Sequence, residues 1–336
     1  MVIIFFNFKN RGYEMLQTPY KDKFEELKEE VREAGLLDRV PLRGSIEMVG
    51  IIISLILLYA TATMWNPFLL AIALTIISTR SVFVAHDILH LQYFKNKKLS
   101  FKLSYPFSTI ILSNSSSWWD FKHNINHHTY CNIIEKDEDI RALDGTFTND
   151  KNRGKSKFLA KYKHLIFWGA LPFMSYSFIV QSYRFVIQRK LWGELILMLL
   201  HWPIIWGTFL LLLPFTDVLT VFLFHHFILS IWLSLGFITN HLACPVYEEE
   251  EAKGVSWMEL QMRGSRSLAG GWLTHWFYGG LNTQIEHHLF PKAPRFHLLK
   301  VKEITQNFAK KNNIFYFETT PLEAYVQINE GLKAYK

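Results

Sequence analysis

Three short segments of this chain hold paired histidines: HDILH at residues 86–90, HNINHH at 123–128 and QIEHH at 284–288. In each of the first two segments, two histidines stand four residues apart, a spacing that places both side chains on one face of a helix. Imidazole is a common ligand of transition metals. The segments therefore predict a metal centre, whose candidate ligands are His86, His90, His123, His127, His128, His287 and His288.

The number of histidines limits the kind of metal centre. His241, at the end of an apolar segment, is an eighth candidate ligand. Eight imidazoles exceed the four ligands of one zinc ion, and the chain has no His-Glu-x-x-His motif of the metalloproteases. Two iron ions would use all eight. A carboxylate-type di-iron bundle is not indicated, because it requires Glu-x-x-His motifs and no histidine here follows a glutamate by three residues.

Three polar residues beside these histidines are candidates for supporting roles. Gln284 stands where a further histidine would complete the third segment, and its amide oxygen can contact a metal directly or through water. Asp87 and Asp120 lie close to candidate ligands, where a carboxylate can accept the second ring N–H of an imidazole. We therefore expect Gln284 as a ninth candidate ligand and both aspartates as partners of ligating histidines.

The remaining histidines are expected to be structural, since a lone histidine pair at helical spacing usually belongs to a core or a surface. His225 and His226 lie ~22 Å from His241 along a helix that rises 1.5 Å per residue, which is too far to join the same site. His275 precedes the third segment and stays an open candidate. Three further histidines are also expected to be structural: His164, His201 and His297.

Four apolar segments are long enough to cross a membrane. Nineteen residues of helix span ~29 Å, the thickness of the hydrocarbon layer. Trp65-Asn66-Pro67 and residues 214–217 divide the segments into two hairpins, and neither turn contains Lys or Arg. Basic residues flank the other ends, which places both termini and all histidine segments on the cytoplasmic side. The predicted spans are residues 46–64, 68–84, 191–213 and 218–239.

Two further apolar stretches are predicted to lie along the membrane surface. Residues 164–186 are long enough to cross, but an odd number of spans would separate the histidine segments. Lysines precede this stretch, arginines follow it and Pro172 interrupts it, so both of its ends are expected in the cytoplasm. Residues 101–119 contain Pro106 and end in the largely polar run NSSSWW, which also favours an interfacial helix.

Aromatic residues flank the histidine segments, namely Trp118, Trp119, Trp272, Trp276 and Phe277. Such side chains can wall a narrow apolar channel for a flexible chain. They are equally common at the boundary between membrane and water. The sequence leaves both interpretations open.

The composition agrees with a membrane protein, because 50% of the residues are hydrophobic and they are clustered along the chain. The net charge of +7 comes from Lys and Arg between and after the apolar segments rather than from one basic module, which argues against a nucleic-acid partner. Cys131 and Cys244 are far apart and form no Cys-x-x-Cys motif, so both are expected to be free thiols.

The N-terminal region is predicted to be a cytoplasmic segment with an amphipathic helix, because KFEELKEEVREAG places Phe24, Leu27 and Val31 on one helical face. The opening MVIIFFNFKNRG lacks the basic start and the small-residue cleavage site of a signal peptide, and Met15 is an alternative start. The predicted divisions are this segment (1–40), a membrane domain (41–310) and a C-terminal cytoplasmic tail (311–336).

Together, these segments resemble the membrane-bound histidine-box fatty acid desaturases. HDILH resembles the first box of that family, HNINHH the second and QIEHH the third, with a glutamine in first position as in front-end desaturases and bacterial acyl-lipid or acyl-CoA relatives. The resemblance covers roughly residues 40–310, and GGLNTQIEHHLFP is its most specific part. It implies an all-α membrane fold with four transmembrane helices in two hairpins, interfacial helices and a cytoplasmic helical cap that holds a His-rich di-iron site.

The resemblance also implies a chemistry. Two iron ions, bound by the box histidines and His241, would use dioxygen to introduce a cis double bond into a fatty acyl chain carried as a lipid or a CoA ester. The His-Pro-Gly-Gly motif of the cytochrome b5 domain that front-end desaturases often carry is absent, so electrons are expected from a separate ferredoxin or cytochrome b5 with its reductase. The acidic residues 248–251 or the basic Lys292, Arg295 and Lys300 offer docking surfaces, although a solvated face explains either.

Two other functions are compatible with the sequence. A hydroxylase or ketolase on the same scaffold would act on an acyl chain, an alkane or a carotenoid, and product analysis separates it from a desaturase. A metal transporter would place its histidines along a path near the middle of the membrane, whereas these segments gather at one boundary. Metal flux that persists in a His287→Ala variant would count against transport.

Overall fold

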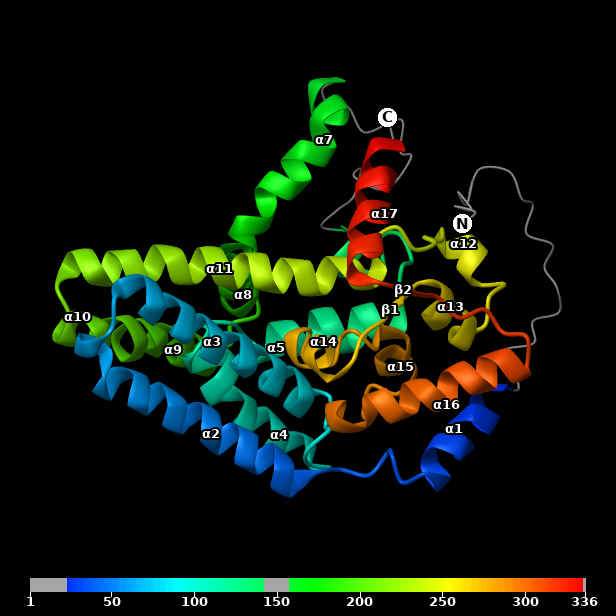
Figure 1. Ribbon diagram of the computed structural model, residues 1–336, viewed down its shortest axis with the longest axis horizontal. Coiled ribbons are helices and arrows are strands. Elements are labelled where there is room, and N and C mark those ends of the chain that lie inside the picture. Colours follow the sequence, from blue (N-terminus) through cyan, green and yellow to red (C-terminus); the bar gives the residue numbers. More distant parts are fainter. Residues whose placement is uncertain (1–22, 142–156, 335–336) are drawn as a thin grey trace.

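The computed structural model describes residues 23–141 and 157–334, so the opening stretch and Met15 lie outside the described residues. Helices dominate these ranges, in agreement with the predicted helical class. Long helices form an elongated bundle, and shorter helices with two short strands form a cap at one end of it (Figure 1).

The first predicted hairpin consists of α2 (Pro41–Ala60), the 3-10 helix η1 (Ala62–Met64) and α3 (Pro67–Leu89). Asn66 caps α3, since its side chain accepts the N–H of Phe68. Pro67 fits the first turn because the N–H that proline lacks would have no helical partner there. α3 continues without a break through HDILH and has His90 as its C-cap, so this long apolar helix itself carries the first histidine pair.

The second hairpin consists of α9 (Trp192–His201), the π helix η5 (Trp202–Gly207), α10 (Thr208–Leu212) and α11 (Phe215–His241). Pro203 lies in the first turn of η5, where its missing amide hydrogen breaks the α-helical bonding pattern. Only Leu213 and Pro214 separate α10 from α11. The turn is thus shorter than predicted, because residues 215–217 already belong to the helix.

α3 and α11 form the centre of the bundle. They pack side by side and run in the same direction, since both start at the far end and finish at the cap (Figure 1). Leu74 of α3 and Val221 of α11 are almost completely buried in the same apolar cluster. This parallel packing brings His90 and His241, at the two helix ends, to one place.

Short helices follow the first hairpin: α4 (Lys97–Ser104), the π helix η2 (Tyr105–Ile110), α5 (Ser116–Trp119), the π helix η3 (Asp120–His127) and α6 (Glu138–Arg141). Of these, α4 and η2 pack against α3 of the bundle. Pro106 lies in the first turn of η2, and Ser115 caps α5 by accepting the N–H of Trp118. At Pro106 the stretch 101–119 changes from α-helix to π helix, and the helix ends at Ile110, before α5 begins at Ser116.

A broken helical segment precedes the second hairpin: α7 (Lys157–Ala170), the 3-10 helix η4 (Leu171–Phe173) and α8 (Met174–Gln188). The break lies at Pro172. α7 points away from the bundle toward α17, whereas α8 packs against α11 (Figure 1). By length and composition, five helical segments of the described chain could cross a membrane: Pro41–Ala60, Pro67–Leu89, Tyr162–Gln188, Trp192–Leu212 and Phe215–His241. The predicted number of four stays a prediction.

The cap contains α1 (Lys23–Glu33), α12 (Glu249–Ala252), α13 (Trp257–Arg263), α14 (Trp272–Phe277), α15 (Gln284–Leu289), the 3-10 helix η6 (Arg295–His297), α16 (Leu298–Lys311) and α17 (Pro321–Ala334). The predicted amphipathic helix is α1, and Leu27 and Val31 are fully buried in a cluster with Ile285 and Val301. Its apolar face thus packs on α16 and α15. Cys131 and Cys244 are free and buried, as predicted.

Two short strands connect the C-terminal segment to the cap: β1 (Ser267–Leu268) and β2 (Glu318–Thr319). They pair in parallel, with Ser267 opposite Glu318 and Leu268 opposite Thr319. α17 follows β2, and its Ala324 is fully buried. The segment predicted as a tail therefore contains elements that pack on the rest of the molecule.

Candidate metal centre

Eight histidines from four elements meet where the bundle joins the cap. Two lie at the end of α3, three in and directly after η3, one at the end of α11 and two in α15. Seven of the eight are buried, and His241 is half-buried. The structure therefore brings together all the histidines that the sequence predicted as ligands: His86, His90, His123, His127, His128, His241, His287 and His288.

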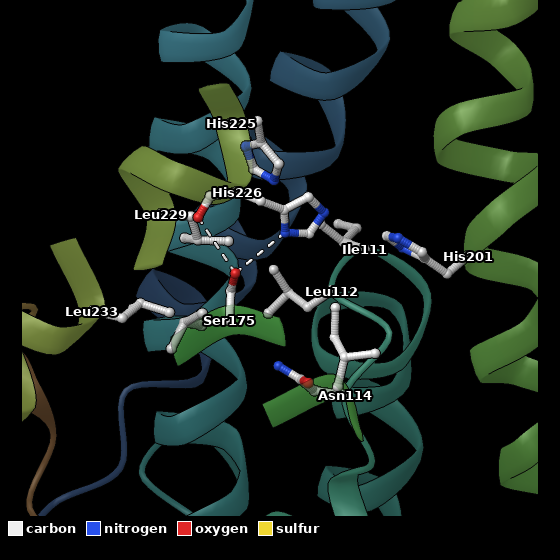
Figure 2. A pocket seen from close by; sticks show the side chains of 11 residues that line it. Ile111, Leu112, Asn114, Ser175, His201, His225, His226, Leu229 and Leu233 are labelled. Atoms are coloured by element: carbon white, nitrogen blue, oxygen red, sulfur yellow. Dashed lines mark hydrogen bonds between the residues drawn. The ribbon is translucent and has the colours of Figure 1, made fainter. Parts of the chain in front are cut away.

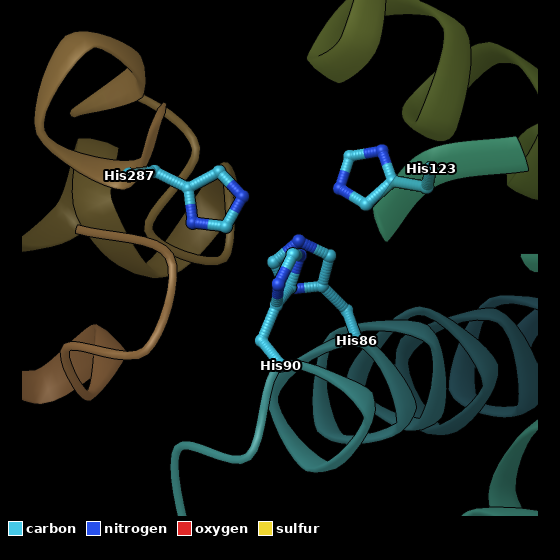
Figure 3. Close-up of side chains that lie close together, drawn as sticks. All are labelled: His86, His90, His123 and His287. Carbon is cyan, nitrogen blue, oxygen red and sulfur yellow. The ribbon is translucent and has the colours of Figure 1, made fainter. Parts of the chain in front are cut away.

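One group of four rings converges on a common point, as Figure 3 shows for His86, His90, His123 and His287. One nitrogen of each ring lies within 4.8 Å of the others. The Nε2 atoms of His86, His90 and His287 are buried and have no hydrogen-bond partner among the described residues. Buried polar atoms without partners are rare and costly in folded proteins, so this point suits a ligand that all four rings can bind.

A second group consists of His127, His241 and His288, whose nitrogens also lie within 4.8 Å of one another. The Nε2 atoms of His127 and His241 are only 3.2 Å apart. Nε2 of His288 is buried without a partner among the described residues. What these three nitrogens can bind depends on where each ring carries its proton.

The outer nitrogen of each ring in this group faces an acceptor. Nδ1 of His241 donates to the carbonyl oxygen of Gly264 at 2.9 Å. Nδ1 of His288 lies 2.6 Å from Oε1 of Gln261, whose amide nitrogen donates to a backbone carbonyl and thereby fixes that oxygen as the acceptor. Nδ1 of His127 lies 2.9 Å from a carboxylate oxygen of Asp137. Each Nδ1 therefore carries the proton, and each Nε2 of the neutral rings is a bare lone pair.

Bare lone pairs that face one another repel unless a cation lies between them. The second group presents three such nitrogens, of which Nε2 of His241 also accepts the amide N–H of Gln284 at 2.8 Å. Partners outside the cluster fix all three rings. This arrangement is the one that ligating histidines adopt, with the second ring nitrogen donating to a carbonyl or carboxylate. The residues present thus fit a bound metal ion, and imidazole nitrogens suit iron among the transition metals.

His128 joins the two groups. Its Nε2 lies 3.3 Å from Nε2 of His123 in the first group, and its ring centroid lies 4.4 Å from that of His288 in the second. The eight rings therefore form one continuous cluster with two centres. The predicted number of two metal ions stays a prediction.

The electrostatics of the cluster favour neutral rings. Burial holds the pKa values of His123, His128, His287 and His288 well below their usual range, and the neighbouring imidazoles lower the pKa values of all four further. A protonated imidazole cannot bind a metal, whereas a neutral one can. The four rings are therefore in the metal-binding form at neutral pH.

The π helix η3 explains how one segment supplies three ligands. The sequence predicted an α-helix with His123 and His127 on one face. The two rings do stack, with centroids 5.2 Å apart, but the helix type was wrong, because η3 is a π helix. Hydrogen bonds of a π helix join residues five apart, so residues at that spacing align. His123 and His128 stand five apart, and their Nε2 atoms meet. The wider turn thereby lets His127 reach the second group while His123 serves the first.

The two predicted aspartate partners differ in outcome. Oδ1 of Asp87 lies 3.2 Å from Nδ1 of His86, which is the contact that the sequence suggested. Asp120 contacts no imidazole among the described residues. It accepts the amide N–H of Asn124 at 2.7 Å and lies 3.6 Å from Nζ of Lys97. The prediction for Asp120 was wrong, because its carboxylate contacts Asn124 and Lys97 instead of a ring.

Asp137 is the carboxylate that the sequence analysis missed. It is fully buried beside His127 and also accepts the backbone N–H of Asn132 at 2.9 Å. Burial raises the pKa of Asp137, but the adjacent His127 ring, its hydrogen bond and the backbone N–H of Asn132 outweigh this effect and leave the pKa below its usual value. Asp139 also lies within reach of His127, but it pairs with Lys122. Both acids belong to the acidic run EKDED, which follows the second histidine segment without helical spacing.

Gln284 lies beside the second group, where its Nε2 is 2.8 Å from Nε2 of His241. Its Oε1 is buried without a partner among the described residues and so keeps its capacity to accept or to bind a metal. A direct contact with a metal stays a prediction. His275 does not join the cluster, because its two ring nitrogens are occupied by Oδ1 of Asn282 and the carbonyl of Arg295, each at 2.9 Å.

Glu286 fixes the short helix that carries His287 and His288. Its carboxylate accepts the hydroxyls of Ser267 at 2.9 Å and Tyr316 at 2.7 Å. Burial raises the pKa of this fully enclosed carboxyl group. The third histidine segment is thus held in place from β1 on one side and from the chain before β2 on the other.

A separate set of histidines lies within the bundle (Figure 2). His225 and His226 are buried on α11 and belong to neither metal group, in agreement with the prediction. Thr75 Oγ1 lies 3.1 Å from Nδ1 of His225, and Ser175 Oγ lies 3.3 Å from Nδ1 of His226. Nδ1 of His201 lies 2.9 Å from the carbonyl oxygen of Ile110. These rings border a cavity of about 10 Å³, room for about one water molecule.

Arg295 was expected on a basic docking surface, and this prediction was wrong. Its side chain is only 3% exposed and contacts Asp87 and Glu47. A guanidinium between two carboxylates is stable away from water, which explains why a charge pattern alone misplaced it. Lys292 and Lys300 are exposed.

Comparison with known proteins places these features in a family context. Residues 63–320 match the family model described as fatty acid desaturase. The chain is 26% identical over 335 residues to the Delta(8)-fatty-acid desaturase 2 of Arabidopsis thaliana, covering 92% of this chain and 74% of that protein. It is 28% identical over 313 residues to the Delta(5) fatty acid desaturase fat-4 of Caenorhabditis elegans, covering 87% and 69%.

A mouse relative extends this comparison. The chain is 30% identical over 277 residues to the fatty acid desaturase 2-like protein FADS2B of Mus musculus, covering 79% of this chain and 55% of that protein. The matches span between half and about three quarters of the length of such relatives. All eight clustered histidines lie inside the matched family region.

Proposed function

The chain belongs to the fatty acid desaturase family, and from this premise we propose that it introduces a cis double bond into a fatty acyl chain, using dioxygen and electrons from a protein donor. The observation that carries the proposal is the second histidine group. Three Nε2 lone pairs face one another there, each fixed by an acceptor on the opposite side of its ring.

Two iron ions are the proposed metal content. One would be held by the group of His86, His90, His123 and His287, and the other by His127, His241 and His288, with His128 between them and Gln284 as a further candidate ligand. Iron held there would supply, with dioxygen, the oxidising power that removal of hydrogen from an unactivated methylene requires. The residues themselves keep the rings neutral, oriented and out of bulk water.

An aromatic wall beside the first group is the proposed surface for the acyl chain. The ring of Trp119 stacks on His123 with centroids 4.8 Å apart, and Phe178 and Phe237 lie 6.1 Å and 6.0 Å from Trp119. Trp119 lies in α5, Phe178 in α8 and Phe237 in α11, so three different elements contribute apolar rings to this wall. Such a wall orients a flexible chain and excludes water from the metal groups. Trp272, by contrast, is 74% exposed, which favours the membrane interface for that residue.

We further propose four membrane crossings, with both termini and the metal groups on the cytoplasmic side. α3 ends at the cluster, whereas α11 starts at the opposite end of the bundle. The chain between them must therefore cross an odd number of times. Residues 192–212 make one crossing, so Tyr162–Gln188 does not make a second. Its break at Pro172 supports an interfacial position.

The proposed partners follow from the family and the site. The acyl chain would arrive as a lipid or a CoA ester, and ferredoxin or cytochrome b5 with its reductase would supply electrons. The basic residues behind the net charge of +7 are proposed to lie at the cytoplasmic membrane surface rather than to bind a nucleic acid. An accessibility tag beside Asn66 is expected to report the outer side, and one at Asn152, outside the described residues, the cytoplasm. A shared side for both tags would contradict the proposed hairpins.

Lipid analysis of a host that expresses this chain tests the proposed activity. Fatty acids are converted to derivatives that locate double bonds, and a host expressing His288→Ala serves as the control. A new double bond that disappears in the control supports desaturation and identifies its position. A new hydroxyl or keto product would assign the chain to an oxygenase instead. Expression with a cytochrome b5 or ferredoxin system shows whether electron supply limits the product.

A further inference from the structure

A buried network of charges lies behind the first histidine group. Arg295 of η6 is 3% exposed, and its Nε lies 3.0 Å from Oδ2 of Asp87, an ion pair in which that nitrogen makes no hydrogen bond. Its Nη2 donates to Oε2 of Glu47. The hydroxyl of Tyr93 lies 2.9 Å from Glu47 and 3.0 Å from Asp87. Arg80 completes the set at 3.2 Å from Oε1 of Glu47, so two guanidinium groups balance two carboxylates.

This network joins three separate parts of the molecule. Glu47 belongs to α2, Asp87 to α3 and Arg295 to the cap. Asp87 uses its two oxygens on opposite sides: Oδ2 faces Arg295 and Tyr93, whereas Oδ1 lies 3.2 Å from Nδ1 of His86. A continuous series of contacts therefore leads from α2 through Arg295 and Asp87 to a candidate metal ligand.

The structure around Arg295 makes room for this side chain. A Cβ on Gly280 would lie 2.6 Å from Cγ of Arg295, and the φ of Gly280 is +87°, a conformation that favours glycine. The backbone N–H of Arg295 donates to Oε1 of Gln92 at 2.9 Å. Its carbonyl accepts the Nε2–H of His275 at 2.9 Å. Three side chains or turns from other segments thus fix the position of this one residue.

Stability alone is a weak explanation for such a network. Taking charges out of water is costly, and well-packed apolar residues often replace a buried ion network without loss of stability. What apolar residues cannot do is hold a carboxylate against the outer nitrogen of an imidazole. That carboxylate has to stay in one orientation if the opposite nitrogen is to face a metal.

We infer that Arg295 is a positioning residue for the metal centre: it holds Asp87, which directs Nε2 of His86 toward the point shared with His90, His123 and His287. The inference rests on the proposed metal-binding role of His86. Arg295 acts through Asp87 and does not itself contact the metal group. The contact with Glu47 ties this orientation to α2, the first long apolar helix of the chain.

Cobalt(II) titration of the metal-free full chain in detergent tests the inference, because the visible absorption of cobalt reports the geometry of its ligands. The variant Arg295→Lys keeps the positive charge but loses the planar fork that reaches two carboxylates. We expect it to bind one of the two cobalt ions ~10–100-fold more weakly than the wild type, with altered absorption bands.

Arg80→Lys is the matched control. It makes the same chemical change at a residue that contacts the same Glu47 but has no ion pair or hydrogen bond with Asp87. We expect its cobalt affinities and absorption bands to equal those of the wild type. Thermal unfolding of both variants separates a loss of stability from a loss of ligand position.

A double variant provides the second test. Because Arg295 is inferred to act through Asp87, Asp87→Asn combined with Arg295→Lys should bind cobalt no more weakly than Asp87→Asn alone. Additive losses in the double variant, or cobalt bands in Arg295→Lys identical to those of the wild type, would overturn the inference. A wild-type chain that binds no cobalt and no iron would overturn the proposed function as well.

Discussion

Two sets of histidines in the same helical bundle show what distinguishes a candidate ligand from a packed side chain. In the cluster of eight, the outer nitrogens of His127, His241 and His288 face a carboxylate, a carbonyl and an amide oxygen. These partners only accept hydrogen bonds, so they force the proton outward and leave the inner nitrogens bare. The protein thereby determines the tautomer of each ring.

His225 and His226 have partners of another kind. Their Nδ1 atoms face the hydroxyls of Thr75 and Ser175, which can donate or accept. A hydroxyl adapts to either tautomer, so these partners do not fix the position of the ring proton, although Nε2 of His226 is also buried without a partner among the described residues. Burial is similar in the two sets, and both contain adjacent histidines. The difference lies in the partners behind the rings, and metal binding should follow the partners rather than the burial.

Removal of a ring from the cluster should have the largest effect. His128→Ala or His288→Ala deletes a candidate ligand, and we expect the fatty acid product to fall at least ~100-fold together with the iron content of the purified protein. Iron is measured by mass spectrometry and the product by gas chromatography. Full activity in His128→Ala would refute the assignment of the cluster.

Removal of an acceptor behind a ring should come next. Asp137→Asn withdraws the charge that fixes His127, and we expect the affinity for iron to fall ~10–100-fold while the ring itself remains. The matched control is Asp120→Asn, which changes a carboxylate near the same segment that contacts Asn124 and Lys97 instead of a ring. Equal losses in the two variants would contradict the role of acceptor-only partners.

The pH dependence of stability should reflect the buried cluster. Unfolded histidine titrates near pH 6.5, and the folded rings of His123, His128, His287 and His288 titrate at lower pH. Below pH 6.5 the unfolded chain therefore binds more protons, so the free energy of unfolding of the metal-free protein should fall, by at most ~1.4 kcal/mol per histidine and pH unit.

This pH effect is measured by thermal unfolding of metal-free protein in detergent between pH 8 and pH 5, with pH values chosen to bracket the titration of free histidine. Well above pH 6.5, where histidine of the unfolded chain is also neutral, these four rings should contribute no slope. The variant His288→Gln should show a shallower decline than the wild type because one titrating ring is gone. A stability that rises as the pH falls would be inconsistent with buried neutral rings.

Removal of a ring from the bundle set should have the smallest effect. His226→Ala deletes a hydrogen bond to Ser175, which keeps Ser230 as a partner at 2.7 Å. We expect a loss of ~1–2 kcal/mol in the free energy of unfolding and no change in iron content or product. Loss of iron from this variant would show that burial, and not the partners, determines which rings bind metal.

The sequence was sufficient for the features that depend on local patterns. The spacing of His86 and His90 on a helix and the position of His241 at a helix end are set by residues close together in the chain, and both agree with the structure. Hydropathy located the two helix hairpins for the same reason. The position of Asp87 directly after His86 in the sequence also identified it as a partner of that histidine.

The features that escaped prediction depend on contacts between distant segments. Gln261 and Gly264 reach the rings from the cap, and nothing in their own sequence context indicates it. Asp137, and not Asp120, lies beside His127, because the turn after η3 brings Asp137 to that ring, whereas Asp120 contacts Asn124 and Lys97. Arg295 looked like a surface charge because its two carboxylate partners lie more than two hundred residues away in the chain.

The pairing of β1 with β2 sets an order for the maturation of this protein. Ser267 and Tyr316 hold Glu286, so the helix that carries His287 and His288 is secured only once residues 316–319 are available. A ribosome releases the chain from its N-terminus, and the first two histidine segments therefore emerge long before Ser267 and Tyr316 can both contact Glu286. Stable metal loading would then be a late event in biogenesis, and a chain interrupted before Tyr316 would be inserted in the membrane yet incomplete as a metal site.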